Sequence, residues 1–160
     1  VAASNPKKIH SYEDVKKNPA LKLAVVNGTS HLTFAEGVGI PEKQLVVIAN
    51  NADALATIAT GRADAYAAVE ATVASLAEKN SKLSTANPFT DPVINGKSMR
   101  SYGGFAFQKQ DSDLVAAFNK ALAAFKKTPE YKKILQTYGV SEQSVNASLM
   151  KTTSKLCGGN

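Results

Sequence analysis

The residues with the clearest capacity for chemistry are Asn27-Gly28-Thr29-Ser30, which follow a short apolar run at 22–26. That run is partly β-branched and predicts a strand buried on both faces. Gly28 permits a tight turn, and Thr29 or Ser30 can cap the helix that follows. A helix start offers N–H groups, hydroxyls and a positive dipole end, which suit an anion such as a ligand carboxylate. The alternative is that these residues form only a turn and a helix cap.

Residues for catalysis or metal binding are sparse. His10 and His31 have no acidic partner at metal-ligand spacing, so a zinc site is not expected. Cys157 is the only cysteine, which excludes an intrachain disulfide and a cysteine-based metal site. No Gly-x-Ser-x-Gly motif supports a nucleophilic serine. Only Glu70 and His31 are placed for acid–base work. We therefore expect no catalytic residue, no metal and no cofactor.

The positive charge is dispersed along the chain. The net charge is +6, but lysines supply nearly all of it, and Arg62 and Arg100 are the only arginines. Nucleic-acid-binding proteins gather arginines and aromatic side chains on one face, so no nucleic-acid partner is expected. A solvated surface with weak attraction for anions is the simpler interpretation. The sequence contains no run of 18 apolar residues, so no membrane span is predicted.

Short apolar runs alternate with helical patterns over the first half of the chain. Strands are predicted at 22–26, 45–49 and 62–68, each followed by a helix. This alternation predicts parallel βαβ units with helices on both faces, an α/β fold. Ligands of such sheets bind beyond the carboxyl ends of the strands. Those ends carry Asn27 to Ser30, Asn50-Asn51 and Val69-Glu70.

The second half has a different composition. Residues 81–100 are rich in Ser, Thr, Asn, Pro and Gly and predict a connector. A strand interrupted by two glycines is predicted at 102–107. Apolar residues at helical spacing over 114–125 and 131–138 predict two helices with buried faces. A short helix is expected at 141–149, followed by a polar, mobile tail over 151–160.

Three pieces of the sequence together resemble the bilobal solute-binding proteins that feed ABC importers of polar amino acids. They are the strand with its Gly28-Thr29 helix start, the segment from Leu55 through Gly61-Arg62-Ala63-Asp64-Ala65, and residues 102–109 with the helices to Gly139. The resemblance covers residues 5–145. Within this family the sequence is most similar to the ectoine/hydroxyectoine-binding branch.

The resemblance implies a periplasmic-binding-protein type II-like fold, in which two α/β lobes joined by crossing strands close on a ligand. Residues 8–82 would be one complete parallel α/β lobe, the second, and 83–100 the crossover connector. Residues 101–150 would be the C-terminal strand and helices of the first lobe, followed by the 151–160 tail. The N-terminal part of the first lobe, which carries the family's carboxylate-binding arginine and aromatic cage, is not expected in this sequence. A missing half-lobe or a second copy of the chain would complete the structure.

The resemblance also assigns a candidate site. The candidate ligand-binding residues are Asn27, Gly28, Thr29, Ser30, Val69 and Glu70. Thr29, with the adjoining backbone, would meet the ligand carboxylate. Amino-acid binders of the family place an Asp for the ligand ammonium where this chain has Val69. That departure favours a zwitterion with a delocalised or alkylated cation, which aromatic faces hold. The alternatives are ordinary packing for Val69 and a first-turn helical role for Glu70.

The predicted function is binding of a small zwitterionic solute, an amino acid or a compatible solute such as ectoine, without chemistry. The solute would be delivered to the membrane subunits of an ABC importer, by a protein in the periplasm or anchored at the cell surface as a lipoprotein. A dehydratase-like enzyme on the same fold is one alternative. A ligand-sensing domain is another, and it would need a fused signalling or DNA-binding segment.

Overall fold

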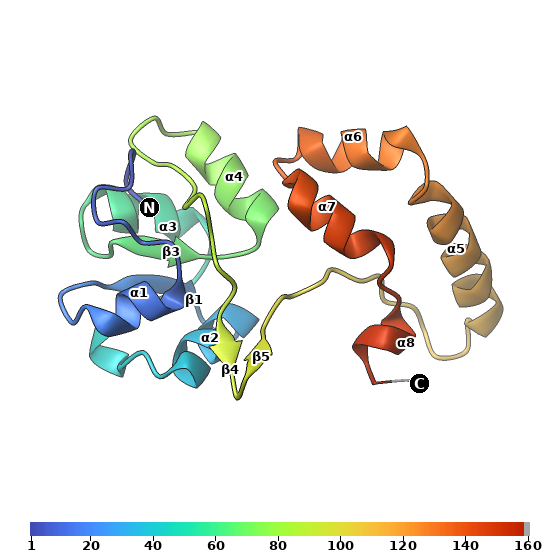
Figure 1. Ribbon diagram of the computed structural model, residues 1–160, viewed down its shortest axis with the longest axis horizontal. Coiled ribbons are helices and arrows are strands. Elements are labelled where there is room, and N and C mark those ends of the chain that lie inside the picture. The colour runs from blue at the N-terminus through green and yellow to red at the C-terminus, as the bar shows by residue number, and fades with distance from the viewer. Residues whose placement is uncertain (159–160) are drawn as a thin grey trace. The chain divides into compact units, whose positions relative to one another are not determined.

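The computed structural model describes residues 1–158, which form two compact units, one spanning Val1–Ser101 and one beginning at Tyr102 (Figure 1). None of the helices in this range combines the length and apolarity that a bilayer crossing requires. The division of the chain into lobe, connector and half-lobe at residues 82 and 100 stays a prediction.

The first unit is built on a parallel three-stranded sheet with the order β2-β1-β3. Strand β1 (Leu23–Val26) lies between β2 (Leu45–Ile48) and β3 (Ala65–Ala67), and Leu23 pairs with Leu45 and Ala65. Parallel neighbours need crossover connections, and helices provide them here. The predicted parallel core is therefore confirmed.

Helices follow each strand of this sheet. Helix α2 (Ser30–Val38) and the short 3₁₀ helix η1 (Glu42–Gln44) connect β1 to β2. Helix α3 (Ala52–Ala59) connects β2 to β3, and α4 (Glu70–Glu78) follows β3. The chain thus leaves all three strands at the same edge of the sheet, as parallel pairing requires.

The core surrounds β1, whose residues Leu23, Ala24 and Val25 are buried. One buried cluster joins β1 to α1 (Tyr12–Lys17) and α2, and a smaller cluster joins Ala24 to α3. Strand β2 is less buried than predicted, because the Val47 side chain is 51% exposed. This strand is an edge of the described sheet, so it has a neighbouring strand on one side only.

A buried glutamine ties α1 to η1. The Gln44 side chain is enclosed, and its Nε2 donates to the carbonyl oxygens of Val15, Asn18 and Leu21 at 2.8, 2.9 and 2.9 Å. Burying an amide is favourable only when it is hydrogen-bonded. These bonds therefore fix the turn that leads from α1 into β1.

The predicted connector contains a short antiparallel hairpin, β4 (Val93–Ile94) and β5 (Lys97–Ser98). Asn95 and Gly96 form its turn with φ of 51° and 75°, the left-handed geometry of tight hairpins. The Ile94 side chain packs against the core cluster of the first unit. This segment is therefore part of the first unit rather than a free linker.

The second unit is helical. It contains α5 (Ser112–Phe125), α6 (Pro129–Thr137), α7 (Glu142–Leu149) and α8 (Thr153–Leu156). The helices predicted in this region are confirmed, but α8 lies in the expected irregular tail. The strand predicted at 102–107 is wrong, since no strand occurs in the described residues after Ser101. A strand needs a hydrogen-bonded neighbour, and this unit supplies none.

The apolar faces of α5 and α6 are exposed in the described residues, and the expectation that a missing half-lobe or a second copy of the chain covers them stays a prediction. Neither helix contains a buried residue, and Leu114 and Tyr138 are 55% and 68% exposed. The apolar spacing is present, but the described part of this unit has no sheet to cover it.

Local ring contacts remain in the second unit. Phe105 and Phe107 pack edge-on against Phe118, with centroids 4.7 and 5.3 Å away, and Phe125 packs similarly against Tyr131. Such pairs contribute only about 0.5–1.5 kcal/mol each beyond area burial. They do not replace a core.

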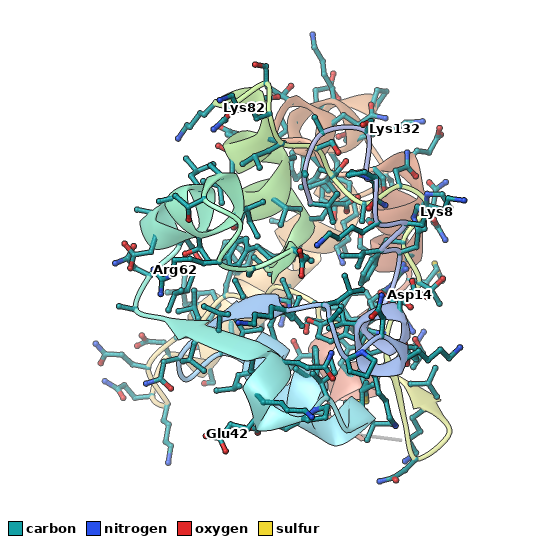
Figure 2. All side chains as sticks on the ribbon, turned by 90° about the vertical axis from the view of Figure 1, so that its left-hand side faces the viewer. Lys8, Asp14, Glu42, Arg62, Lys82 and Lys132 are labelled. Carbon is teal, nitrogen blue, oxygen red and sulfur yellow. The ribbon has the colours of Figure 1, made fainter. Side chains whose placement is uncertain are left out.

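Charged side chains are spread over the surface. Figure 2 shows Glu42, Arg62 and Lys82 projecting from separate parts of the first unit. Lys7 pairs with Asp64, and the Arg100 Nε lies 2.7 Å from an Asp91 oxygen. The carboxylates of both pairs are largely buried, with the Asp64 side chain 13% and the Asp91 side chain 24% exposed. The distribution fits the solvated surface expected from the sequence.

Candidate ligand-binding site

A hollow of about 150 Å³ lies in the first unit, where β1 and β3 end and α2, α3 and α4 begin. This is the edge of the sheet at which the sequence places the candidate site. The residues that line it are Val26, Thr29, His31, Asn51, Tyr66, Ala67, Ala68, Val69 and Thr72. No Asp, Glu, Lys or Arg is among them.

The start of α2 forms one wall of the hollow. Gly28 has a φ of 71°, which lets the chain turn from β1 into the helix, and Thr29 occupies the N-cap position. The Thr29 hydroxyl donates to the Val26 carbonyl oxygen at 2.8 Å and does not cap the helix. The predicted capping by Thr29 or Ser30 is therefore wrong, since a nearer carbonyl attracts the Thr29 hydroxyl and Ser30 is already the first helical residue.

The missing cap has a consequence for ligand binding. Within the described residues, the N–H groups of Ser30 and His31 have no hydrogen-bond acceptor. Such groups carry the positive end of the helix dipole, and an anion satisfies them. The beginning of α2 is therefore able to hold a carboxylate.

His31 adds an imidazole to the same wall. Its Nδ1 lies 3.2 Å from the hydroxyl oxygen of Tyr12, and its ring packs edge-on against Phe34 with a centroid separation of 6.0 Å. Burial lowers the pKa of His31 below its ordinary value, so the ring is neutral at neutral pH. Burial also raises the pKa of Tyr12, which keeps the phenol protonated.

Asn51 and Tyr66 form another part of the lining. The Tyr66 hydroxyl donates to Oδ1 of Asn51, which links β3 to the start of α3. This bond orients the Asn51 amide and leaves its NH₂ group as a donor. Burial raises the pKa of Tyr66, so its hydroxyl also keeps its proton. The hollow is thus uncharged, and it combines a few polar groups with the apolar side chains of Val26, Ala67, Ala68 and Val69.

No protein-family model matches this sequence. The chain is 46% identical over 157 residues to a probable amino-acid ABC transporter periplasmic-binding protein of Sinorhizobium fredii. The chain is related to periplasmic solute-binding proteins. The match covers 98% of this chain and 52% of that relative, so the chain spans about half of the relative's length.

A solved structure supports the same relationship. The crystal structure of EhuB in complex with hydroxyectoine is similar to this chain with a TM-score of 0.70 and 26% identity. The match covers 98% of this chain and 58% of EhuB. The resemblance to solute-binding proteins and the expected α/β, periplasmic-binding-protein-like fold class are both confirmed.

The structure distributes the predicted site residues unevenly around the hollow. Thr29 and Val69 line it, and Val69 is 53% exposed at the N-cap of α4. Asn27, Gly28 and Ser30 are exposed beside it, outside its lining. Their roles in a solute-binding protein stay predictions.

Glu70 begins α4, is half-buried and does not line the hollow. Sequence reasoning missed Thr72, which does line it. Thr72 is three residues after Val69 on the same helix face, so helical spacing could have identified it.

Proposed function

We propose that this chain contributes one wall of the cleft in a solute-binding protein, and that this wall binds the carboxylate of a small zwitterionic solute. The observation that carries the proposal is the uncapped start of α2 beside the hollow. A carboxylate would accept from the Ser30 and His31 N–H groups, as anions do at helix starts. The role is binding without chemistry, which fits the names of both related proteins.

The ligand's cationic end sets its chemical class. A primary ammonium needs an anionic partner, and no carboxylate lines this hollow. Val69 stands where the resemblance implies an aspartate in amino-acid binders. A cyclic or methylated zwitterion is therefore the favoured ligand, and hydroxyectoine, which EhuB binds, is its representative. A free amino acid, suggested by the name of the Sinorhizobium relative, is the alternative.

The proposed partners follow from the same relationship. The solute would pass to the membrane subunits of an ABC importer, and the protein would act in the periplasm, as the relative's name indicates for that protein. The exposed apolar faces of α5 and α6 would be covered by a segment equivalent to the part of the relatives that this chain does not span. Burying each Leu or Phe contributes about 1.5–3 kcal/mol, which favours such a contact.

The proposal is tested by calorimetric titration of the chain with glycine betaine, hydroxyectoine and choline. Both zwitterions carry a carboxylate, whereas choline matches glycine betaine in its cation and lacks the carboxylate. We expect both zwitterions to bind with a Kd on the order of 1 mM, because the proposal gives this chain one wall of the cleft only, and choline not to bind. Equal binding of choline, or no binding of either zwitterion, would contradict the proposal.

A further inference from the structure

The Tyr12–His31 pair connects the core of the first unit to the hollow. Tyr12 belongs to α1, is 5% exposed and packs within the main buried cluster. Its hydroxyl oxygen reaches Nδ1 of His31 at 3.2 Å. His31 is the second residue of α2, and it lines the hollow. The Tyr12 hydroxyl therefore links the core to His31, whose side chain lines the hollow.

The hydrogen bond between Tyr12 and His31 determines which nitrogen of the His31 imidazole carries the hydrogen. A buried phenol has to donate its proton to an acceptor, and within the described residues His31 is the partner of the Tyr12 hydroxyl. The phenol stays protonated and the imidazole neutral, since burial raises the pKa of Tyr12 and lowers that of His31. A neutral imidazole accepts at one nitrogen and donates from the other. Nδ1 is thus the acceptor, and Nε2 carries the hydrogen.

The Nε2–H group has no hydrogen-bond partner in the described part of the chain. It belongs to the same helical turn as the two N–H groups at the start of α2. We infer that His31 is a ligand-binding residue that donates Nε2–H to the solute carboxylate, and that Tyr12 is the positioning residue that fixes this tautomer. This inference rests on the proposed function and adds a side-chain donor to the backbone groups.

The tautomer is measured first, by long-range ¹H–¹⁵N correlation on the imidazoles of the wild-type chain. We expect protonated Nε2 and unprotonated Nδ1 for His31, and protection of the Nε2 hydrogen from exchange when hydroxyectoine is added. A wild-type ring protonated at Nδ1, or an Nε2 hydrogen unaffected by bound hydroxyectoine, would overturn the inference. This measurement needs no substitution, so a variant that fails to fold does not affect it.

Affinity for hydroxyectoine is then compared among three variants. His31→Phe keeps a ring and removes the donor, and it should weaken binding about tenfold, the effect of one lost hydrogen bond to a charged group. Tyr12→Phe keeps the core packing and should mix the His31 tautomers and weaken binding about threefold. His10→Phe is the matched control, because His10 Nδ1 contacts the Pro88 carbonyl oxygen, away from the hollow, and should leave affinity unchanged.

The outcomes distinguish a failure of the proposed function from a failure of the roles of His31 and Tyr12. Wild-type chain that binds no zwitterion would overturn the proposed function, and this inference with it. Wild-type chain that binds, together with a folded His31→Phe variant of equal affinity, would overturn the role of His31 alone. A Tyr12→Phe variant with an unchanged tautomer would overturn the positioning role of Tyr12.

Discussion

The Thr29 side chain lies where β1 ends and α2 begins, and its hydroxyl donates to the Val26 carbonyl at 2.8 Å. The hydroxyl oxygen therefore keeps its lone pairs, and the helix keeps its unsatisfied N–H groups. Val69 faces the same hollow from α4 without any polar atom in its side chain. We therefore expect Thr29 to help position N–H donors for the carboxylate of the solute. We expect Val69 to leave the cationic group of the solute without an anionic partner.

Thr29→Val should weaken zwitterion binding more than it weakens folding. Valine cannot hold the turn through the Val26 carbonyl, and a disturbed hydrogen bond to a carboxylate costs about 1.5–3 kcal/mol of binding free energy. The free energy of unfolding should fall by about 1 kcal/mol or less, because the site is partly exposed. Calorimetry and urea unfolding measure the two effects. Thr33→Val, one turn further along α2 and exposed, is the control, and equal affinities of the two variants would contradict the role of Thr29.

Val69→Asp should change the preferred ligand class. The new carboxylate would form a charge-assisted hydrogen bond with a primary ammonium, whereas a methylated cation without an N–H donor would gain only the weaker charge attraction. We expect the ratio of glycine to glycine betaine affinity to rise about tenfold, the effect of one charge-assisted hydrogen bond. Competition titrations of both ligands against wild type measure the ratio. An unchanged ratio would mean that position 69 does not contact the ligand.

At the level of elements, a single buried amide joins η1 to the end of α1. The Nε2 group of Gln44 shares its two hydrogens among three backbone carbonyl oxygens, those of Val15 in α1 and of Asn18 and Leu21 in the turn that leads into β1. The element boundaries were predictable because caps, apolar runs and glycines are local signals. The Gln44 contacts were not, since they join residues 23 to 29 positions apart in sequence.

Gln44→Leu should destabilise the first unit by about 2 kcal/mol. Leucine fills similar space, but it leaves the buried Leu21 carbonyl oxygen without its donor, which costs about 1–3 kcal/mol, while the Val15 and Asn18 carbonyls keep backbone N–H donors. Urea unfolding monitored in the first unit measures this loss. Lys43→Ala, the exposed neighbour in η1, should change the free energy of unfolding by less than about 0.5 kcal/mol. A Gln44→Leu variant as stable as the Lys43→Ala variant would contradict this account of the turn.

Across the whole molecule, the two units differ in what covers their apolar residues. The first unit buries Leu23, Val25 and Ala65 between helices, whereas α5 and α6 of the second unit bury none of their residues. The sheet of the first unit was predictable because each strand has its partners within residues 23–67. The strand at 102–107 and the buried helix faces were not formed, because both need neighbours that the described residues do not supply. The Tyr12–His31 contact was also hidden, since no local pattern connects α1 to α2.

Hydrogen exchange should therefore proceed at different rates in the two units. Backbone amides of β1 should be the most protected, and amides of α5 and α6 should exchange at least about tenfold faster, because few buried contacts oppose local opening. Exchange followed by mass spectrometry measures both regions in one sample. Equal protection of β1 and α5 would show that the second unit is covered in solution, and size-exclusion chromatography with light scattering would then reveal a second copy.

The central claim is that the start of α2 receives the carboxylate of a zwitterionic solute. Amide chemical-shift mapping of the ¹⁵N-labelled chain during titration with hydroxyectoine tests it most directly. We expect the largest concentration-dependent shifts at the Ser30 and His31 amides, with smaller shifts at Asn51 and Val69 around the same hollow. Shifts confined to the second unit, or saturable binding that leaves the Ser30 and His31 amides unchanged, would contradict it.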